Sequence, residues 1–558
     1  MKRTTADLTT HLTTVLLLGL LVVGLAAIMT TFQAPLAAET SKSDLAFEEV
    51  SVDRGFTYSA NAHMQMGNSR AGVYVSDVTN NGYPDILAIG GDEPVLYIND
   101  GGHFEASTAL PEINATISAA VFFDKNGNGW EDLFLLPRDD SPILLANEEG
   151  TFEHRSAGLA DLELRVPVAA SVADYNRNGC LDVFIVQNGE WQRGLPAKEQ
   201  RAKDAQILGQ EPSEIVVEND NGNPNYLLEG DCASGTFEDV TTEVGIDGER
   251  WSMATSFADF TGNGYPDIHE ANDFNYDYLW VNNEGDGFER ERLPDTNRHA
   301  MSSLPMDVTG NGELDLFVTN IHLLGDTGAK QVLASVDNSG NNLLINDGGG
   351  FSSQEFEYNV RDGGWGWAAV ASDFTNNGEV DLIHATHHET NLNAPEQSVL
   401  TQPRVWVRDG GTFRRVDSAA AGFLPQNGRG LAALDFNGNG QEDLVTSNLD
   451  SHFKLYENQG PSQNWLQVTV RDGDGAIAIG ARATIHSHSS GSDIDQHIPI
   501  KARTDLLSQS SRRHHVGLGD ATKATVEVTF PDGTIRTYGP LDSNQHVELY
   551  KNGSVKTV

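Results

Sequence analysis

Short apolar runs alternate with polar, glycine-rich segments over most of the chain. Runs such as 119–123 (AAVFF) and 133–136 (LFLL) are too short for helices and resemble buried strands. A third apolar run in each unit ends in an Asn/Gly-rich turn followed by Phe, as in 343–351, which is the pattern of a β-hairpin. The pattern therefore predicts an all-β protein made of many short strands.

A nine-residue segment, Asp-x-(Asn/Thr)-x-Asn-Gly-x-x-Asp, lies between the first two strands of each unit. We call its copies the first to seventh Asp loops, and their starts lie 47, 50, 85, 48, 66 and 62 residues apart. A unit of four strands at this spacing is typical of a propeller blade. The seven loops are residues 77–85, 124–132, 174–182, 259–267, 307–315, 373–381 and 435–443.

The last unit indicates how the ring closes. Its third strand, residues 455–460, runs into Pro461 without a Phe-led fourth strand, whereas residues 46–50 look like the fourth strand at 236–240. We therefore expect the N-terminal segment to complete the last blade, which would remove exposed sheet edges. The prediction is a seven-bladed β-propeller over residues 45–460 and a small β-sandwich-like domain over residues 461–558.

The Asp loops carry oxygen ligands at positions 1, 3, 5 and 9, and a glycine at position 6 allows a sharp turn. Such a ligand set suits Ca²⁺; the alternative is a set of Asx-turns that cap backbone amides. Because only two of the four ligand positions in each loop are carboxylates, we expect weak affinity, toward ~10⁻⁴ to 10⁻³ M. The candidate calcium ligands are Asp77, Thr79, Asn81, Asp85, Asp124, Asn126, Asn128, Asp132, Asp174, Asn176, Asn178, Asp182, Asp259, Thr261, Asn263, Asp267, Asp307, Thr309, Asn311, Asp315, Asp373, Thr375, Asn377, Asp381, Asp435, Asn437, Asn439 and Asp443.

The net negative charge of the chain indicates that the protein binds cations more readily than anions. The 558 residues include 36 Lys and Arg against 80 Asp and Glu, a formal net charge of −44. A field of this sign repels phosphate, so nucleic acid and anionic membrane surfaces are poor partners. The Asp residues at positions 1 and 9 of the loops account for fourteen of the carboxylates, and we interpret the rest as a solvated acidic coat suited to high salt.

The first forty residues predict export. Lys2 and Arg3 precede an apolar run at 15–29, which as a helix would reach about 22 Å, short of the ~30 Å core of a bilayer. A signal peptide over residues 1–38, cleaved after Ala38, fits this length; an uncleaved N-terminal membrane anchor and a buried helix are the alternatives. We expect a secreted, periplasmic or cell-surface protein.

The loops and hairpins resemble the FG-GAP/VCBS repeats of integrin-α-type propellers. The tail resembles the ASPIC/UnbV domain of the cartilage acidic protein family, and residues 271–274, 364–366 and 428–430 also resemble this family. Two departures are the Asn or Thr at loop positions 3 and 5, and Phe530 where the family usually has Trp. The resemblance implies calcium-stabilised extracellular binding or adhesion, without catalytic residues. The matching tail segments are 464–466, 479–483, 508–509, 515–519 and 530–533.

Strand alternation predicts two different faces of the propeller. The Asp loops and the Gly turns belong to one face, and the connections between the second and third strands belong to the other. Three of these connections are long: 188–225, 321–341 and 387–403. Since loops on a rigid scaffold often carry function, we expect recognition on the face opposite the Asp loops.

Several unusual side chains belong to that opposite face or to the start of the inner strands. One hypothesis is a central pocket in which tryptophans stack on sugar rings and Arg binds a carboxylate or sulfate; the alternative is ordinary packing along the axis. His384 with His387 and His388 suggests either a transition-metal site or a polar loop. The candidate ligand-binding residues are Arg70, Trp251, His299, Trp365, Trp367, His384 and Arg429.

Cys180 and Cys232 lie on the same face of the third blade, so a disulfide is predicted, with two free thiols as the alternative. The function that fits best is an exported calcium-binding protein for adhesion to, or recognition of, a glycan, matrix component or cell-surface protein. One alternative is a carbohydrate-active propeller enzyme of the polysaccharide lyase or sugar dehydratase type, with Arg429, His384 and the tryptophans in its active site. A structural envelope or matrix protein is the other. A filled axis favours the binding protein, and a deep central cleft favours the enzyme.

Overall fold

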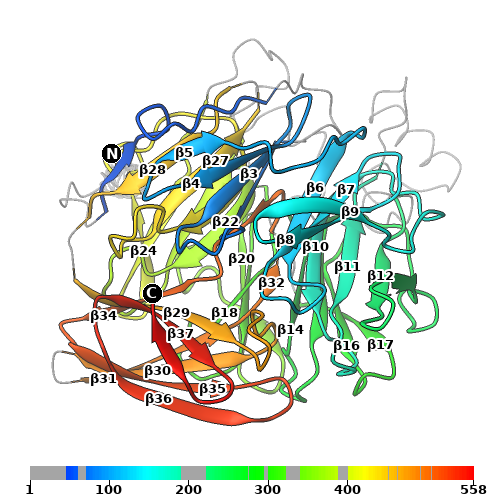
Figure 1. Ribbon diagram of the computed structural model, residues 1–558. Coiled ribbons are helices and arrows are strands. Elements are labelled where there is room, and N and C mark those ends of the chain that lie inside the picture. Colours follow the sequence, from blue (N-terminus) through cyan, green and yellow to red (C-terminus); the bar gives the residue numbers. More distant parts are fainter. Residues whose placement is uncertain are drawn as a thin grey trace, which may run out of the picture. The chain divides into compact units, whose positions relative to one another are not determined.

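A computed structural model describes the protein (Figure 1). The predicted signal peptide, residues 1–38, lies outside the described residues. Residues 44–558 group into one compact unit. No helix within the described part of the chain is long and apolar enough to cross a membrane. The described ranges are 45–60, 71–189, 222–273, 275–294, 299–321, 340–387, 400–449, 451–460, 463–489, 492–503 and 505–558.

Seven sheets form the blades of the propeller, and in each the Asp loop joins the two innermost strands (Figure 1). From the axis outward, the first three blades are β2 (Gly72–Ser76), β3 (Asp85–Ile89), β4 (Val95–Asn99) and β5 (Phe104–Ala106); β6 (Ile117–Phe123), β7 (Asp132–Pro137), β8 (Ile143–Glu148) and β9 (Thr151–Arg155); and β10 (Pro167–Ala173), β11 (Asp182–Gln187), β12 (Tyr226–Gly230) and β13 (Phe237–Asp239). The next three are β14 (Trp251–Ala258), β15 (Asp267–Asp273), β16 (Tyr278–Asn282) and β17 (Phe288–Arg292); β18 (Leu304–Met306), β19 (Asp315–Val318), β20 (Asn342–Asn346) and β21 (Phe351–Ser353); and β22 (Gly366–Ser372), β23 (Asp381–Thr386), β24 (Arg404–Asp409) and β25 (Thr412–Val416).

The seventh blade joins the two ends of the propeller and confirms the predicted closure. It contains β26 (Gly428–Leu434), β27 (Asp443–Asn448) and β28 (Lys454–Asn458), and β1 (Phe47–Glu49) is its outermost strand. β1 pairs antiparallel with β28, with Phe47 opposite Asn458. The all-β propeller fold predicted from the repeat is therefore correct.

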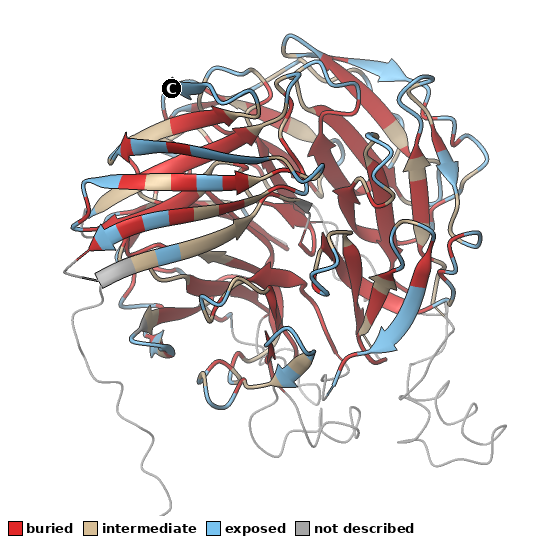
Figure 2. Ribbon diagram, turned by 90° about the horizontal axis from the view of Figure 1, so that it is seen from below, coloured by how far each residue is buried: buried red, intermediate tan, exposed pale blue. Residues whose placement is uncertain are grey.

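The tail is a sandwich of two four-stranded sheets with its own core. Leu466, Val526 and Val547 belong to this core, and alternate residues of the outer strands are exposed (Figure 2). One sheet has the order β34 (His514–Gly519), β29 (Asn464–Arg471), β37 (Gln545–Tyr550) and β38 (Val555–Thr557). The other has the order β31 (Ser492–Pro499), β30 (Arg482–Ser489), β35 (Lys523–Thr529) and β36 (Ile535–Asp542).

Residues 501–513, which connect β31 to β34, leave the sandwich and enter the axis of the propeller. We call them the axial segment. Within it, β32 (Ala502–Arg503) pairs with the inner strand β10, and β33 (Ser508–Gln509) pairs with the inner strand β2. The tail therefore belongs to the sheets of the propeller as well as to its own sandwich.

The axial segment satisfies backbone amides on the inner edges of the blades. The carboxylate of Asp505 accepts the N–H of Ser303, directly before β18, at 3.1 Å and that of Ala369 in β22 at 2.6 Å. The N–H of Val73 in β2 donates to the carbonyl of Leu507 at 3.0 Å. Leu506 and Leu507 join the same buried cluster as Trp251 and Trp367, so the axis is filled by packed side chains.

We predict that Asp505→Asn lowers the free energy of unfolding by about 2–4 kcal/mol, because an amide NH₂ would replace one of two acceptor oxygens facing buried N–H groups. Denaturant unfolding followed by tryptophan fluorescence measures the change. Asp474→Asn, at an exposed turn of the tail, is the matched control. Equal stability of the two variants would contradict a role of Asp505 in holding the axis together.

Candidate functional site

All seven Asp loops share one backbone geometry. The first Asp accepts the N–H of the glycine at position 6 at 2.6–3.0 Å, and that glycine has a φ of 79–91°, which disfavours any side chain. The amide oxygen of the Asn at position 5 accepts the N–H of position 7, as in Asn81 and Tyr83 at 2.8 Å. The Asx-turns considered from the sequence are thus present in the structure.

The Asp at position 9 ties its loop to the third strand of the blade. One carboxylate oxygen accepts a backbone N–H at the end of that strand at 2.8–2.9 Å in every blade, as Asp85 does from Asn99. The other accepts an N–H inside the loop, such as that of Val78 at 2.9 Å. Burial raises the pKa of Asp85 and Asp132 to about 7.

An asparagine at the end of the third strand links neighbouring blades. The side-chain NH₂ of Asn147 donates to the carbonyl of Val78 in the loop of the preceding blade at 2.9 Å. In the third and sixth blades this position holds Gly230 and Arg408 instead. The Asp loops are therefore contact points between blades as well as ligand candidates. The same link is made by Asn99, Asn147, Asn282, Asn346 and Asn458.

The loops also fit the donor set that calcium prefers. Oδ1 of Asp259, in the fourth Asp loop, is buried and accepts no hydrogen bond from any described residue. A buried carboxylate oxygen without a donor is costly unless positive charge compensates it, and the guanidinium of Arg482 in the tail supplies part of that charge. Carboxylate, amide and hydroxyl oxygens supply the rest of the set at positions 3, 5 and 9. Among the described residues, no group of three His, Cys, Asp or Glu side chains is arranged to hold a metal, which matches the two carboxylates per loop.

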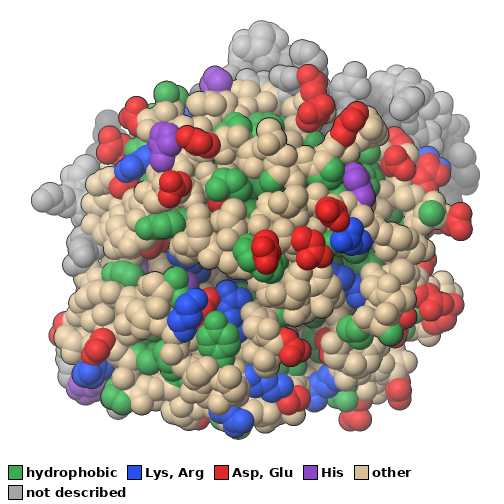
Figure 3. Space-filling view, viewed as in Figure 1, with side chains coloured by type: hydrophobic (Ala, Val, Ile, Leu, Met, Phe, Trp, Pro, Cys, Tyr) green, Lys and Arg blue, Asp and Glu red, His purple; other side chains and the backbone are tan. Residues whose placement is uncertain are grey.

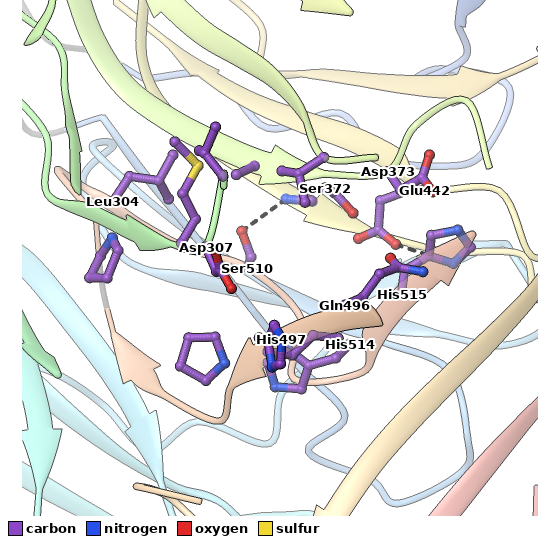
Figure 4. Close-up of a pocket in the computed structure, with 18 of the residues that line it drawn as sticks. Leu304, Asp307, Ser372, Asp373, Glu442, Gln496, His497, Ser510, His514 and His515 are labelled. Carbon is purple, nitrogen blue, oxygen red and sulfur yellow. Dashed lines mark hydrogen bonds and ion pairs between the residues drawn. The ribbon is translucent and has the colours of Figure 1, made fainter. Parts of the chain in front are cut away.

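The tail covers part of the face that bears the Asp loops and encloses a cavity of about 640 Å³ against it (Figure 4). Propeller residues Asp307, Asp373 and Glu442 line this cavity on one side, and tail residues His497 and His514 line it on the other. The cavity is therefore a junction between carboxylates of the propeller and nitrogen-bearing side chains of the tail.

Basic side chains of the tail meet carboxylates of the loop face. Arg513 lies 3.3 Å from Asp77 of the first Asp loop, and Arg512 pairs with Glu131 of the second. Figure 3 shows Lys and Arg side chains gathered over the lower part of the molecule, where the tail lies. A chain with 36 basic residues thus concentrates several of them at one internal junction.

Most residues predicted to bind a ligand are buried along the axis. Trp251 and Trp367 are each 7 % exposed, and His384 is fully buried. The guanidinium of Arg429 lies 4.0 Å from the ring centre of Trp367 and donates to Asn427 at 2.9 Å. His299 contacts Asp273 at 2.8 Å. These contacts match the packing alternative in the sequence analysis.

Trp365 is the member of that set that is partly exposed. Its ring stacks on His387 at 4.9 Å between centres, at the end of the propeller where the inner strands begin. Its indole N–H donates to no described residue. Arg70 and His388 lie outside the described residues, as do most of the three long connections. The structure thus brings Trp365, Trp367 and His387 together.

The two cysteines form a disulfide, with Cα atoms 5.5 Å apart. Cys180 is position 7 of the third Asp loop, and Cys232 belongs to the Gly turn of the same blade. The bond therefore fastens an exposed Asp loop to the turn beside it.

Sequence reasoning did not identify the axial segment. Asp505, Leu507 and Gln509 lie in a connection between tail strands, and local pattern alone assigns them no partner 136–434 residues away. One signal was available: Arg512 and Arg513 form a basic pair in a strongly acidic chain. Such a pair indicates an internal contact with carboxylates.

Comparison with known proteins supports this architecture. Residues 77–135 match the family model for an FG-GAP-like repeat, and residues 472–556 match the model for ASPIC and UnbV. The chain carries an FG-GAP-like repeat and an ASPIC and UnbV domain. It is 24 % identical to cartilage acidic protein 1 of Xenopus tropicalis over 475 residues, covering 80 % of this chain and 60 % of the relative. The mouse protein is 24 % identical over 481 residues, covering 81 % of this chain and 63 % of the relative.

The chain thus spans about three fifths of the length of these curated relatives. Among solved structures, the WD40 domain of Toxoplasma gondii coronin is 11 % identical with a TM-score of 0.43, covering 76 % of this chain and 88 % of that one. YCF48 bound to D1 peptide is 8 % identical with a TM-score of 0.40, covering 76 % and 99 %. The FG-GAP-like repeat and the cartilage acidic protein relatives support an extracellular propeller protein.

We predict acid sensitivity from the buried histidines of this FG-GAP-like propeller. Burial lowers the pKa of His384 to about 3, so the folded protein keeps it neutral. The unfolded chain takes up a proton below its pKa of ~6.5, so stability falls as the pH drops through that value. We expect His384 to cost about 2 kcal/mol at pH ~5 relative to pH ~8. Unfolding at the two pH values should differ less in His384→Gln than in the exposed control His103→Gln; an unchanged difference would contradict this role.

Proposed function

We propose that the protein is an extracellular, calcium-binding propeller for adhesion to, or recognition of, a glycan or matrix component. Three features support this function: similarity to cartilage acidic protein 1, seven loops with the oxygen donors that calcium prefers, and an axis that is filled. When bound, calcium would supply positive charge between the carboxylates of each loop. The Asp and Asn side chains of this chain hold the loops in the shape that receives it.

The filled axis is the observation that carries the proposal. An enzyme that uses Arg429, His384 and the axial tryptophans needs them to reach a substrate. Instead, Trp367 packs in one cluster with Leu506 and Leu507 of the tail, and His384 is fully buried. A protein that fills its own axis is better suited to binding through its surface.

The position of the tail favours the opposite face for recognition. The tail rests on the face of the Asp loops, so that face is already occupied in part by the chain itself. Trp365 lies at the other end of the inner strands and is partly exposed, although its indole nitrogen is buried. The exposed part of an aromatic ring offers a flat apolar surface on which a sugar ring can stack.

We predict that the full chain is retained by a subset of immobilised neutral or acidic polysaccharides in millimolar calcium and is released by a chelator. Trp365→Ala should weaken this retention by about 5- to 10-fold, since an aromatic contact contributes ~0.5–1.5 kcal/mol beyond its buried area. Trp130→Ala is the matched control, because Trp130 is a partly exposed tryptophan in the second Asp loop. Retention is measured by depletion of the protein from solution.

Three results would count against parts of the proposal. If no polysaccharide retains the protein, glycan recognition is wrong. If retention is the same with calcium and with chelator, calcium has no part in it. If both tryptophan variants lose retention equally, the recognition surface does not lie on the face of Trp365.

A further inference from the structure

The sixth Asp loop differs from the others in how fully it is enclosed. Asp373 and Asn376 are each 2 % exposed, and Thr375 is 4 % exposed. In the fourth Asp loop, by contrast, residues 261–263 are all exposed. The two loops share the same nine-residue pattern, so the difference comes from what covers them.

The cover is the tail. The N–H of Gly519 donates to the carbonyl of Asn376 at 3.0 Å, and the His515 ring contacts the side chain of Asn376. The side chain of Ile494 lies over Gly378, where a Cβ would meet it at 3.3 Å. Two strands of different tail sheets, β34 and β31, therefore meet on this loop.

Gly517, in β34, is the tail residue whose backbone lies against Asp373 and Asn376 of the sixth Asp loop. A Cβ at this position would lie 2.0 Å from Oδ2 of Asp373 and 2.5 Å from the Cα of Asn376. Only a residue without a side chain lets β34 lie this near to the first carboxylate of the loop. The fit between tail and loop therefore depends on a single glycine.

The enclosed loop contains two buried carboxylates. Asp381 is fully buried, and no cationic side chain among the described residues forms an ion pair with it or with Asp373. Two like charges in a buried place are costly unless a cation compensates them. Their oxygen atoms accept neutral backbone N–H groups, as Asp373 does from Gly378 at 2.6 Å and Asp381 from Arg408 at 2.9 Å, which leaves the negative charge without a cation among the described residues. With the hydroxyl of Thr375 and the amide oxygen of Asn377 they form a donor set that suits calcium.

A third carboxylate lies beside the loop. Glu442, which is position 8 of the seventh Asp loop, is 5 % exposed and lines the same cavity under the tail as Asp373. The nearest basic atom is Nδ1 of His515, at 4.0 Å (Figure 4). Negative charge thus accumulates where the tail closes over the sixth Asp loop.

We propose that the sixth Asp loop is an occluded calcium site closed by the C-terminal domain, so that its ion leaves only when that domain moves away. This inference rests on the proposed calcium function. Because the same loop binds the ion and the tail, calcium strengthens the docking of the tail, and the docked tail strengthens calcium binding by the same factor. The seventh Asp loop also contacts the tail, because Gln467 donates to Asp435 at 2.8 Å, but its residues 438 and 439 are exposed. Loops with exposed middle residues, such as the fourth, exchange calcium without this constraint.

Release kinetics test the site in the full chain. The calcium-loaded protein is mixed with a chromophoric chelator, and the equivalents released in each phase are counted. We expect one equivalent to leave at least ~10-fold more slowly than the rest, since outer partners of a metal site change affinity by ~10- to 100-fold. Hydrogen exchange of the Gly519 amide, which donates to Asn376, reports tail docking independently of calcium release.

Two variants with matched controls separate the causes. Asp373→Asn should remove the slow equivalent and raise exchange at Gly519, whereas Asp259→Asn in the open fourth Asp loop should remove a fast equivalent and leave Gly519 protected. Gly517→Ala should keep the number of equivalents and make the slow one fast. Its control is Gly473→Ala, where an added Cβ meets no atom within 4 Å.

The outcomes distinguish this inference from the proposal on which it rests. If the protein binds no calcium, the calcium function itself is wrong. If calcium binds but every equivalent leaves in one phase, the function stands and the occluded site is wrong. The occluded site is also wrong if the slow equivalent survives Asp373→Asn, or if calcium removal leaves exchange at Gly519 unchanged.

Discussion

The backbone N–H groups on the inner edges of the blades need hydrogen-bond acceptors at the axis. The rest of this structure depends on which residues supply those acceptors. Buried backbone N–H groups without acceptors are costly, and seven inner strands direct such groups toward one another. Asp505, Leu507, Gln509 and Ser510 of the tail accept them in five blades, and β32 pairs with the inner strand of a sixth. In the fourth blade, Ser171 of the neighbouring strand accepts instead. The tail thus completes the hydrogen bonding of the propeller.

The outer parts of the blades are held in a different way. Each Asp loop is fastened to its own blade by the Asp at position 9, and an asparagine in most blades reaches back to the preceding loop. The acidic repeat is consequently a structural joint, whatever ion it holds. This explains why one residue pattern serves exposed loops such as the fourth and the enclosed sixth alike. The loops differ in their surroundings and share their internal geometry.

Periodic features were predictable from the sequence, and contacts between distant residues were not. The repeat gave the number of blades, and the missing fourth strand of the last unit predicted that residues 46–50 would complete that blade, as the pairing of Phe47 with Asn458 confirms. The path of the axial segment was hidden, because Asp505 and Leu507 sit in an ordinary connection between strands. One sequence feature does reflect the path of the axial segment. Gly430 is a glycine because a Cβ at this position would lie 2.3 Å from the carbonyl oxygen of Leu507. The role of such a glycine becomes visible only when the approaching backbone is known.

The position of the axial segment in the chain has a consequence for biosynthesis. Residues 501–513 follow all seven blades, so a ribosome has delivered every inner strand before the residues that pair with those strands exist. During that interval the propeller holds a ring of unpaired strand edges, and edges of this kind recruit foreign strands. A polypeptide exported in extended form would emerge in the same order. The axis can therefore be completed only after residues 501–513 have been made, and the pairing of its inner strands depends on this short connection.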